Sequence, residues 1–231
     1  MGRRQTAVER TRERIVAATF ELHASIGPSR TTIRAIAERA GVQRHTVYAH
    51  FPDIESLYEA CTVHGIRSTA MPEPGGWRSI DDPNHRLRHG LAEMFAWYRA
   101  NERMLGNVLF DVDPNAPAPT SPDAFDLRMG ALLDALLDGL TIEPDGSPTE
   151  PDGSPTEPDR PPILEAVVAH ALDFTTWRSL VRGGLTDDQV VTVLMGLVGH
   201  TRERRDRADR PRHATGEVAQ GPARQALRAE T

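Results

Sequence analysis

The sequence predicts an all-α fold, with a small N-terminal helical module followed by a larger helical domain. Apolar residues recur at spacings of three and four over most of the chain, which is the period of an amphipathic helix. Strand signals, meaning alternating β-branched residues bounded by tight Asn-Gly or Asp-Gly turns, are missing. Breaks that contain Gly or Pro divide the chain into segments of helical length.

The first four helices can be placed from their apolar stripes and their caps. We expect them at residues 7–26, 32–40, 44–50 and 54–71. Thr31 and Thr32 can cap the second helix, and Asp53 can cap the fourth. Gly41 is suited to a left-handed turn between the second and third helices. These short helices form the N-terminal module, which we place at residues 1–53.

The later helices are expected at residues 84–100, 102–111, 122–140, 162–182 and 187–203, within a second domain spanning 54–203. The last helix has a capping box, with Thr186 as the cap and Gln189 three residues on. Its apolar face, with Leu197 as one member, needs a covering surface beyond the helix before it. That surface is either ordinary intramolecular core or a second copy of the chain, which would form a four-helix bundle.

Composition excludes several classes of protein. The 231 residues include one cysteine, so no internal disulfide and no cysteine-based zinc cage can form. The longest apolar stretch, at 190–198, is about half the length of a bilayer span. No apolar segment follows the polar N-terminus, as a secretory signal would require. We therefore expect a soluble, cytoplasmic protein with no membrane partner.

Charge is distributed unevenly along the chain. The net charge is −6, and all 27 basic residues are Arg. Residues 1–50 carry +5, whereas residues 111–159 alone carry −11. This asymmetry favours a head that faces nucleic acid on an acidic body, although a charged run can also be a plain solvated surface.

One internal repeat interrupts the second domain. Glu-Pro-Asp-Gly-Ser-Pro-Thr occurs at 143–149 and again at 150–156. Its proline and acid content leaves it too little apolar surface to bury, so residues 141–160 are expected to form a disordered acidic loop. The Arg-rich tail at 204–231 is likewise expected to be disordered.

The segment at 32–51 carries the strongest functional signal. Small and apolar residues such as Ala37 and Val47 occupy the positions that two short helices need in order to cross closely. With those positions inward, the second helix presents Gln43, Arg44, His45, Tyr48 and Ala49 outward. In a helix-turn-helix that face enters the major groove, where Gln and Arg suit adenine and guanine edges and Tyr and His can contact phosphates.

These residues are similar to the N-terminal module of the TetR (tetracycline repressor-like) family of regulators. The similarity lies in RIVAA at 14–18, Gly27, TTIRAIAERAGV at 31–42 and TVYAHFP at 46–52, about a quarter of the chain. Three positions depart from the family pattern. His23 stands where an aromatic core residue is usual, His45 replaces a usual Gly, and Ile54 replaces a Lys that commonly contacts phosphate.

The resemblance implies a sequence-specific DNA-binding regulator, most simply a ligand-responsive repressor that binds a palindromic operator. The partners that it implies are double-stranded DNA, an unidentified small-molecule effector and a second copy of the chain. The second copy would bind through the helices at 162–182 and 187–203. No cofactor is implied. The DNA contacts it implies are Thr31, Thr32, Gln43, Arg44, His45, Thr46, Tyr48 and His50. The expected effector pocket consists of aromatic and Met residues of the larger domain, a pattern that more often forms plain core: Met94, Trp97, Tyr98, Met104, Phe110, Phe174 and Trp177.

The alternative is an enzyme, or a helical protein that binds a small molecule, in which the DNA-binding module is secondary. The sequence has no Gly-rich phosphate loop, nucleophile elbow or His-Glu-x-x-His motif, so no catalytic residue is predicted. His85 and His89 have the spacing of a metal pair but lack a third ligand, and no metal site is predicted. Cys61 is expected to be a packed thiol.

Overall fold

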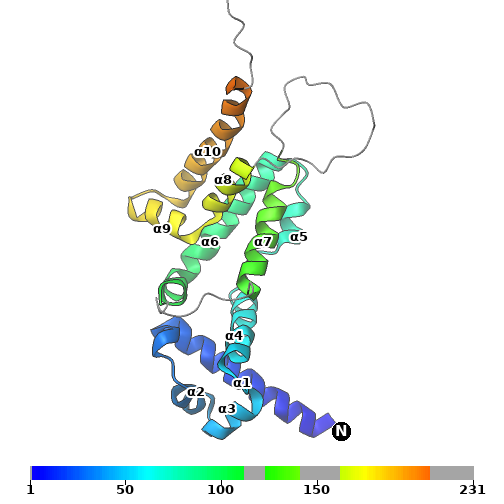
Figure 1. Cartoon of the computed structure of the whole chain (residues 1–231), viewed down its shortest axis with the longest axis vertical. Helices are drawn as coiled ribbons and strands as arrows, with labels where there is room; N and C mark the ends of the chain where they lie inside the picture. Colours follow the sequence, from blue (N-terminus) through cyan, green and yellow to red (C-terminus); the bar gives the residue numbers. More distant parts are fainter. Residues whose placement is uncertain (1, 112–122, 141–161, 209–231) are drawn as a thin grey trace, which may run out of the picture.

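The computed structural model describes residues 2–111, 123–140 and 162–208, and in these residues it is all-helical (Figure 1). The predicted fold class is confirmed. The elements of the N-terminal module and its exit are α1 (Gly2–Ile26), the 3₁₀ turn η1 (Pro28–Arg30), α2 (Ile33–Ala40), α3 (Arg44–His50) and α4 (Ile54–Ser68). The body consists of α5 (Pro74–Arg78), α6 (Pro83–Phe110), α7 (Ala124–Leu137), α8 (Pro162–Leu172), α9 (Phe174–Arg182) and α10 (Asp187–Ala208).

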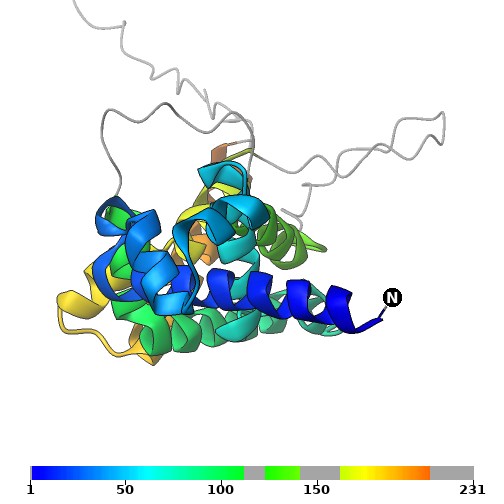
Figure 2. The same ribbon diagram turned by 90° about the horizontal axis from the view of Figure 1, so that it is seen from below.

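The described residues form two hydrophobic cores. The smaller core joins α1, α2, α3 and the start of α4 and contains Ile15, Ile36, Val47 and Leu57. The larger core joins α5 to α10 and is centred on α6. We call the unit around the smaller core the head and the unit around the larger core the body. They lie at opposite ends of an elongated molecule, and the N-terminal part of α1 projects away from both (Figures 1 and 2).

Several helix boundaries differ from those predicted. The helices expected at 84–100 and 102–111 are one continuous helix, α6, in which Asn101 is helical and donates its side-chain amide to the Trp97 carbonyl at 2.9 Å. The helix expected at 162–182 divides into α8 and α9, because the Asp173 carboxylate caps a new helix by accepting from the Thr175 and Thr176 amides.

Other differences concern the ends of helices. The helix expected to reach residue 71 ends at Ser68, and η1 and α5 were not predicted. Helix α10 continues to Ala208, so it includes the first five residues of the predicted tail. The predicted acidic loop at 141–160 and the tail from residue 209 lie outside the described residues. Among the described helices, none is long and apolar enough to cross a membrane.

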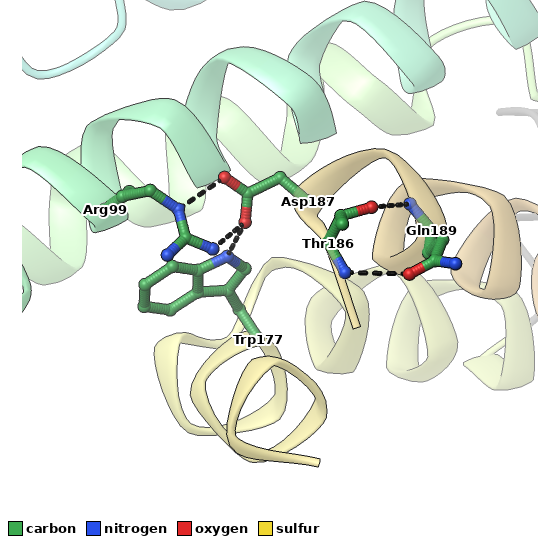
Figure 3. A network of polar contacts seen from close by, with 5 residues as sticks. All are labelled: Arg99, Trp177, Thr186, Asp187 and Gln189. Carbon is green, nitrogen blue, oxygen red and sulfur yellow. Dashed lines mark hydrogen bonds and ion pairs between the residues drawn. The ribbon is translucent and has the colours of Figure 1, made fainter. Parts of the chain in front are cut away.

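A polar network fixes α9 and α10 against α6 (Figure 3). Asp187, at the start of α10, accepts two hydrogen bonds from Arg99 of α6 at 2.6 and 2.7 Å. The Trp177 indole donates to the same carboxylate at 2.9 Å. The adjacent capping box between Thr186 and Gln189 is present as predicted. Together these bonds hold the α9–α10 turn on the long helix that runs towards the head.

Candidate DNA-binding surface and effector pocket

The turn between α2 and α3 is built by three local features. Thr32 caps α2 by accepting from the Ala35 amide at 3.1 Å. Gly41 takes the predicted left-handed conformation, with φ 64° and ψ 40°, which a residue with a side chain resists. Arg14 of α1 donates to the Ala40 and Gly41 carbonyls, so the turn is fastened to the long first helix. The geometry is that of a helix-turn-helix.

Helix α3 buries one side and exposes the other, as the sequence predicts. Val47 is 1% exposed and packs in the head core. Gln43, Arg44, His45 and Tyr48 are exposed, and the Tyr48 side chain retains 55% of its accessible surface. Of the other predicted contacts, Thr32 is exposed, and Thr31, Thr46 and His50 are half-buried beside this face. Gln43 precedes α3 without using its side chain as a cap, so its amide is left for a ligand.

Arg44 differs from the cations of α2 in its surroundings. Arg34 pairs with Glu38 at 2.8 Å, and Arg39 pairs with Glu21 at 2.6 Å. Within the described residues, no ion pair involves Arg44. An exposed guanidinium without a carboxylate partner can bind a phosphate or a guanine edge without first breaking an ion pair.

The predicted pocket residues fall into three environments. Tyr98, Phe174 and Trp177 are buried and pack on one another, with the Tyr98 ring centroid 5.2 Å from that of Phe174 and 5.6 Å from that of Trp177. The Tyr98 hydroxyl is already bonded to the Leu172 carbonyl, and burial raises its pKa. Met94 is buried in the same core, whereas Phe110 is 53% exposed. The remaining two residues, Trp97 and Met104, line a cavity.

This cavity has a volume of about 120 Å³ and lies where the head meets the body. Sequence reasoning missed most of its lining, since only Trp97 and Met104 belong to the predicted set. The other lining residues include Phe20 and His23 of α1, Cys61, Thr62 and Ile66 of α4, Val108 and Leu109 of α6, and Phe125 of α7. The available signal was the spacing of Phe20 and His23, which lie three residues apart and so share one face of α1.

Polar contacts join the head and the body beside this cavity. The Ser29 amide and hydroxyl donate to the Asp111 carboxylate at 2.8 and 2.6 Å. These bonds lower the pKa of Asp111, the Ser29 hydroxyl having the larger effect. Asn107 donates to the Ala24 carbonyl at 2.8 Å. A side chain at Gly27, where φ is +88°, would collide with Asp111, since its Cβ would lie 2.1 Å from Asp111 Oδ2.

Among the described residues, no group of three or more His, Cys, Asp or Glu is placed to hold a metal ion. Burial raises the pKa of Cys61 to about 12, which suits the packed thiol expected from the sequence. His89 contacts Glu93 at 3.6 Å on the surface of α6.

Comparison with known proteins identifies the head. Residues 15–61 match the family model of the bacterial regulatory proteins of the tetR family, so the predicted resemblance is confirmed. The matched residues run from α1 into α4 and so contain the helix-turn-helix. No curated protein sequence matches the chain.

Two solved structures match the chain. A tetR-family transcriptional regulator from Streptomyces coelicolor is 22% identical, with 88% of this chain and 90% of that chain covered and a TM-score of 0.54. A TetR transcriptional regulator from Rhodococcus sp. RHA1 is 19% identical, with 83% and 95% covered and a TM-score of 0.45. The first similarity extends over head and body, so this chain shares the overall fold of that structure.

Proposed function

We propose that the chain is a sequence-specific transcriptional regulator that acts as a homodimer on a palindromic operator. The observation that carries this proposal is the outer face of α3. It offers Gln43, Arg44, His45 and Tyr48, in a segment that matches a family of regulatory proteins. Two such heads reach successive major grooves when they lie about 34 Å apart, which is one turn of DNA. A protein with this function acts in the cytoplasm, where bacterial DNA lies.

A second copy of the chain would cover apolar surface on α8 and α10. Ile163 on α8 is 58% exposed, and Val193 and Leu197 on α10 are 50% and 43% exposed. The two helices pack against each other (Figure 1). Nothing lies within 4 Å of a Cβ added at Gly196 or Gly199, so another helix has room to approach closely. These features support a dimer formed through α8 and α10, which lie within the helices at 162–182 and 187–203 that the sequence analysis names for dimerisation.

We further propose that the regulator is a repressor released from DNA by a small molecule. A ligand shifts a conformational equilibrium only when it binds one state better than the other. The cavity lies between α1 of the head, the connecting helix α4, and α6 and α7 of the body, so a molecule in it contacts both parts. Filling the cavity would favour one placement of the head over another, and hence one spacing of two heads.

DNA binding can be tested by selecting bound sequences from random DNA and then measuring affinity for the selected site. Arg44→Ala should weaken operator binding by about 10-fold or more, as expected for loss of a base or phosphate contact. Tyr48→Phe removes a single hydroxyl and should weaken binding by about 2- to 10-fold. Both variants should unfold at the wild-type temperature, because both side chains are exposed.

Arg88→Ala is the matched control, since Arg88 is an exposed arginine on α6 in the body. It should leave operator affinity within about 2-fold of wild type, because the body does not enter the groove. Unchanged affinity for both α3 variants would contradict the assignment of α3 as the recognition helix. Equal affinity of the wild type for selected and random DNA would contradict sequence-specific regulation.

A further inference from the structure

Helix α3, which presents the candidate DNA contacts, has few packing contacts of its own. It is seven residues long, and of these Val47 is buried. Gln43, directly before it, makes no capping hydrogen bond with its side chain. A helix of this length is barely stable by itself in water, because most helical stability in proteins comes from packing against other elements. The direction of α3 therefore depends on the contacts that hold its two ends.

Helix α1 holds the start of α3 through Arg14. A terminal nitrogen of the Arg14 guanidinium donates to the carbonyls of Ala40 and Gly41, in the turn that leads into α3. Carbonyls at the C-terminal end of a helix have no partner within that helix, and a cation there also faces the negative end of the helix dipole. Arg14 thereby fixes the end of α2 and, with it, the turn from which α3 begins.

Arg12, two residues earlier on α1, contacts the other end of α3. Its guanidinium carbon lies 4.8 Å from the centre of the Phe51 ring, within the range of a cation–π contact. Phe51 directly follows α3, is 3% exposed, and donates its amide to the Val47 carbonyl at 2.9 Å. We call Arg12 and Arg14 the α1 arginine pair. The pair contacts the chain on both sides of α3.

From these contacts we propose that the α1 arginine pair positions α3 for DNA recognition, by holding it at the angle at which its outer face reads bases. The inference rests on the proposed function, since it assigns a role at the same surface. Arg44 and Tyr48 lie about 6 Å apart along the helix axis, so a tilt of about 10° would displace one relative to the other by about 1 Å. Base readout depends on hydrogen bonds whose lengths vary by only about 0.5 Å, so such a tilt would disrupt it.

Direct contact with a DNA phosphate is the alternative role, because Arg14 is exposed as well as charged. The two roles differ in what a substitution removes. Loss of a phosphate contact weakens binding to all sequences about equally and reduces the salt dependence of the affinity. Loss of a positioning contact weakens binding to the operator and leaves binding to random DNA unchanged, since phosphate contacts carry no sequence information. The ratio of operator affinity to random-DNA affinity therefore separates the two roles.

The test measures this ratio for the full chain, on the operator obtained by selection and on random DNA of the same length. Arg14→Met removes charged hydrogen bonds and should lower the ratio by about 10-fold. Arg12→Met removes a cation–π contact and should lower it by about 3-fold. Arg10→Met is the matched control, because Arg10 is exposed on the same helix and forms no ion pair with the described part of the chain. Its ratio should stay within about 2-fold of wild type.

Arg14→Lys tests the same contact with the charge retained. A lysine ammonium still reaches toward the carbonyls but is more strongly hydrated than a guanidinium, so its ratio should lie between those of wild type and Arg14→Met. Its affinity for random DNA should match that of wild type. This variant decides the point if Arg14→Met does not fold. A ratio within about 2-fold of wild type in every folded Arg14 variant overturns the proposal, as does an equal loss of affinity for operator and random DNA.

Amide hydrogen exchange followed by NMR tests the positioning role without DNA. The Val47 and Phe51 amides bond to the Gln43 and Val47 carbonyls. They should exchange at least about 5-fold faster in Arg14→Met than in wild type and Arg10→Met, whereas the Leu57 amide, on α4 in the head core, should change less. Equal rates in the three proteins overturn the positioning role. Faster exchange in a chain that selects no DNA sequence refutes the proposed function alone.

Discussion

His23 shows how burial alters the chemistry of a single side chain. The residue stands where a resembling protein would have an aromatic ring, and it packs as one, edge-on to Tyr58 with ring centroids 4.7 Å apart. Burial lowers its pKa from 6.5 to about 4, and the nearby Asp111 carboxylate opposes this shift only partly. The Cys61 thiol, whose own pKa is raised, adds no charge near pH 7. An uncharged imidazole is thereby held at the junction of head and body.

This shift predicts a dependence of stability on pH. Below pH 6.5 the unfolded chain takes up a proton at His23, whereas the folded chain does so only near pH 4. The free energy of unfolding should therefore fall as the pH is lowered through this window, by about 2–3 kcal/mol in total. Urea denaturation of wild type and His23→Phe at several pH values from 7 to 4 measures the difference. Parallel profiles for the two proteins would contradict the shift.

At the scale of single residues, the sequence pattern predicts whether a side chain points inward or outward better than it predicts which residues that side chain contacts. The outward placement of Gln43, Arg44 and Tyr48 follows from the helical period once Val47 is assigned inward. The buried Nε2 of His23, which has no hydrogen-bond partner in the described part of the chain, could not be predicted, because it depends on helices that meet only in the folded chain. The aromatic pocket residues illustrate the same limit, since spacing alone does not distinguish a packed ring such as Tyr98 from one that lines a cavity.

The helices end where side chains can cap them. Thr32, Asp53 and the Thr186–Gln189 box were all recognised in the sequence, and each makes the expected backbone contact. Asp173 has the same role between α8 and α9, although the sequence pattern predicts it as helix interior because the apolar spacing continues across it. Capping chemistry is thus as informative as periodicity for placing a boundary.

Asp187 is the point where three helices are tied together, and its replacement should cost stability. Asp187→Asn keeps an acceptor for the Trp177 indole but loses the charge that faces Arg99. We expect a decrease of about 1–2 kcal/mol in the free energy of unfolding at pH 7, measured by urea denaturation. Asp188→Asn is the matched control and should cost less than about half as much, because the exposed Asp188 side chain faces solvent at the same helix end.

The same substitution has a pH signature. Arg99, and to a lesser extent Trp177, lower the pKa of Asp187 below its ordinary value of 3.8. A carboxylate with a lowered pKa in the folded state stabilises it above the pKa of the unfolded chain, and this stabilisation is lost as the pH falls below that value. The difference between wild type and Asp187→Asn should therefore persist from pH 7 to about pH 5 and shrink below pH 4. A difference that is constant down to pH 3 would contradict this role.

At the scale of the whole molecule, the relation between head and body is the feature that sequence reasoning could not supply. The two units have separate cores, and each was predicted from its own helical pattern. Their junction depends on pairs such as Ser29 with Asp111, which are 82 positions apart. A contact between residues at that separation produces no periodic pattern in the sequence. The cavity at the junction was missed for the same reason.

The exposed apolar surface of α10 leads to a prediction about assembly. Val193 and Leu197 are four residues apart and so lie on one face of the helix, with Gly196 beside them. If two copies meet there, an arginine at Leu197 would be buried without a partner, at a cost of several kcal/mol. Leu197→Arg should therefore raise the dimer dissociation constant by about 100-fold or more, measured by sedimentation velocity.

Leu127→Arg provides the matched control, because Leu127 is 62% exposed on α7 and lies outside α8 and α10. It should leave the dimer intact. On DNA, the Leu197→Arg protein should bind a full operator about as weakly as a half-site, because its two heads then bind independently. The Leu127→Arg protein should retain the wild-type preference for the full operator. Dissociation of Leu127→Arg with an intact Leu197→Arg dimer would place the dimer interface on α7, away from α10.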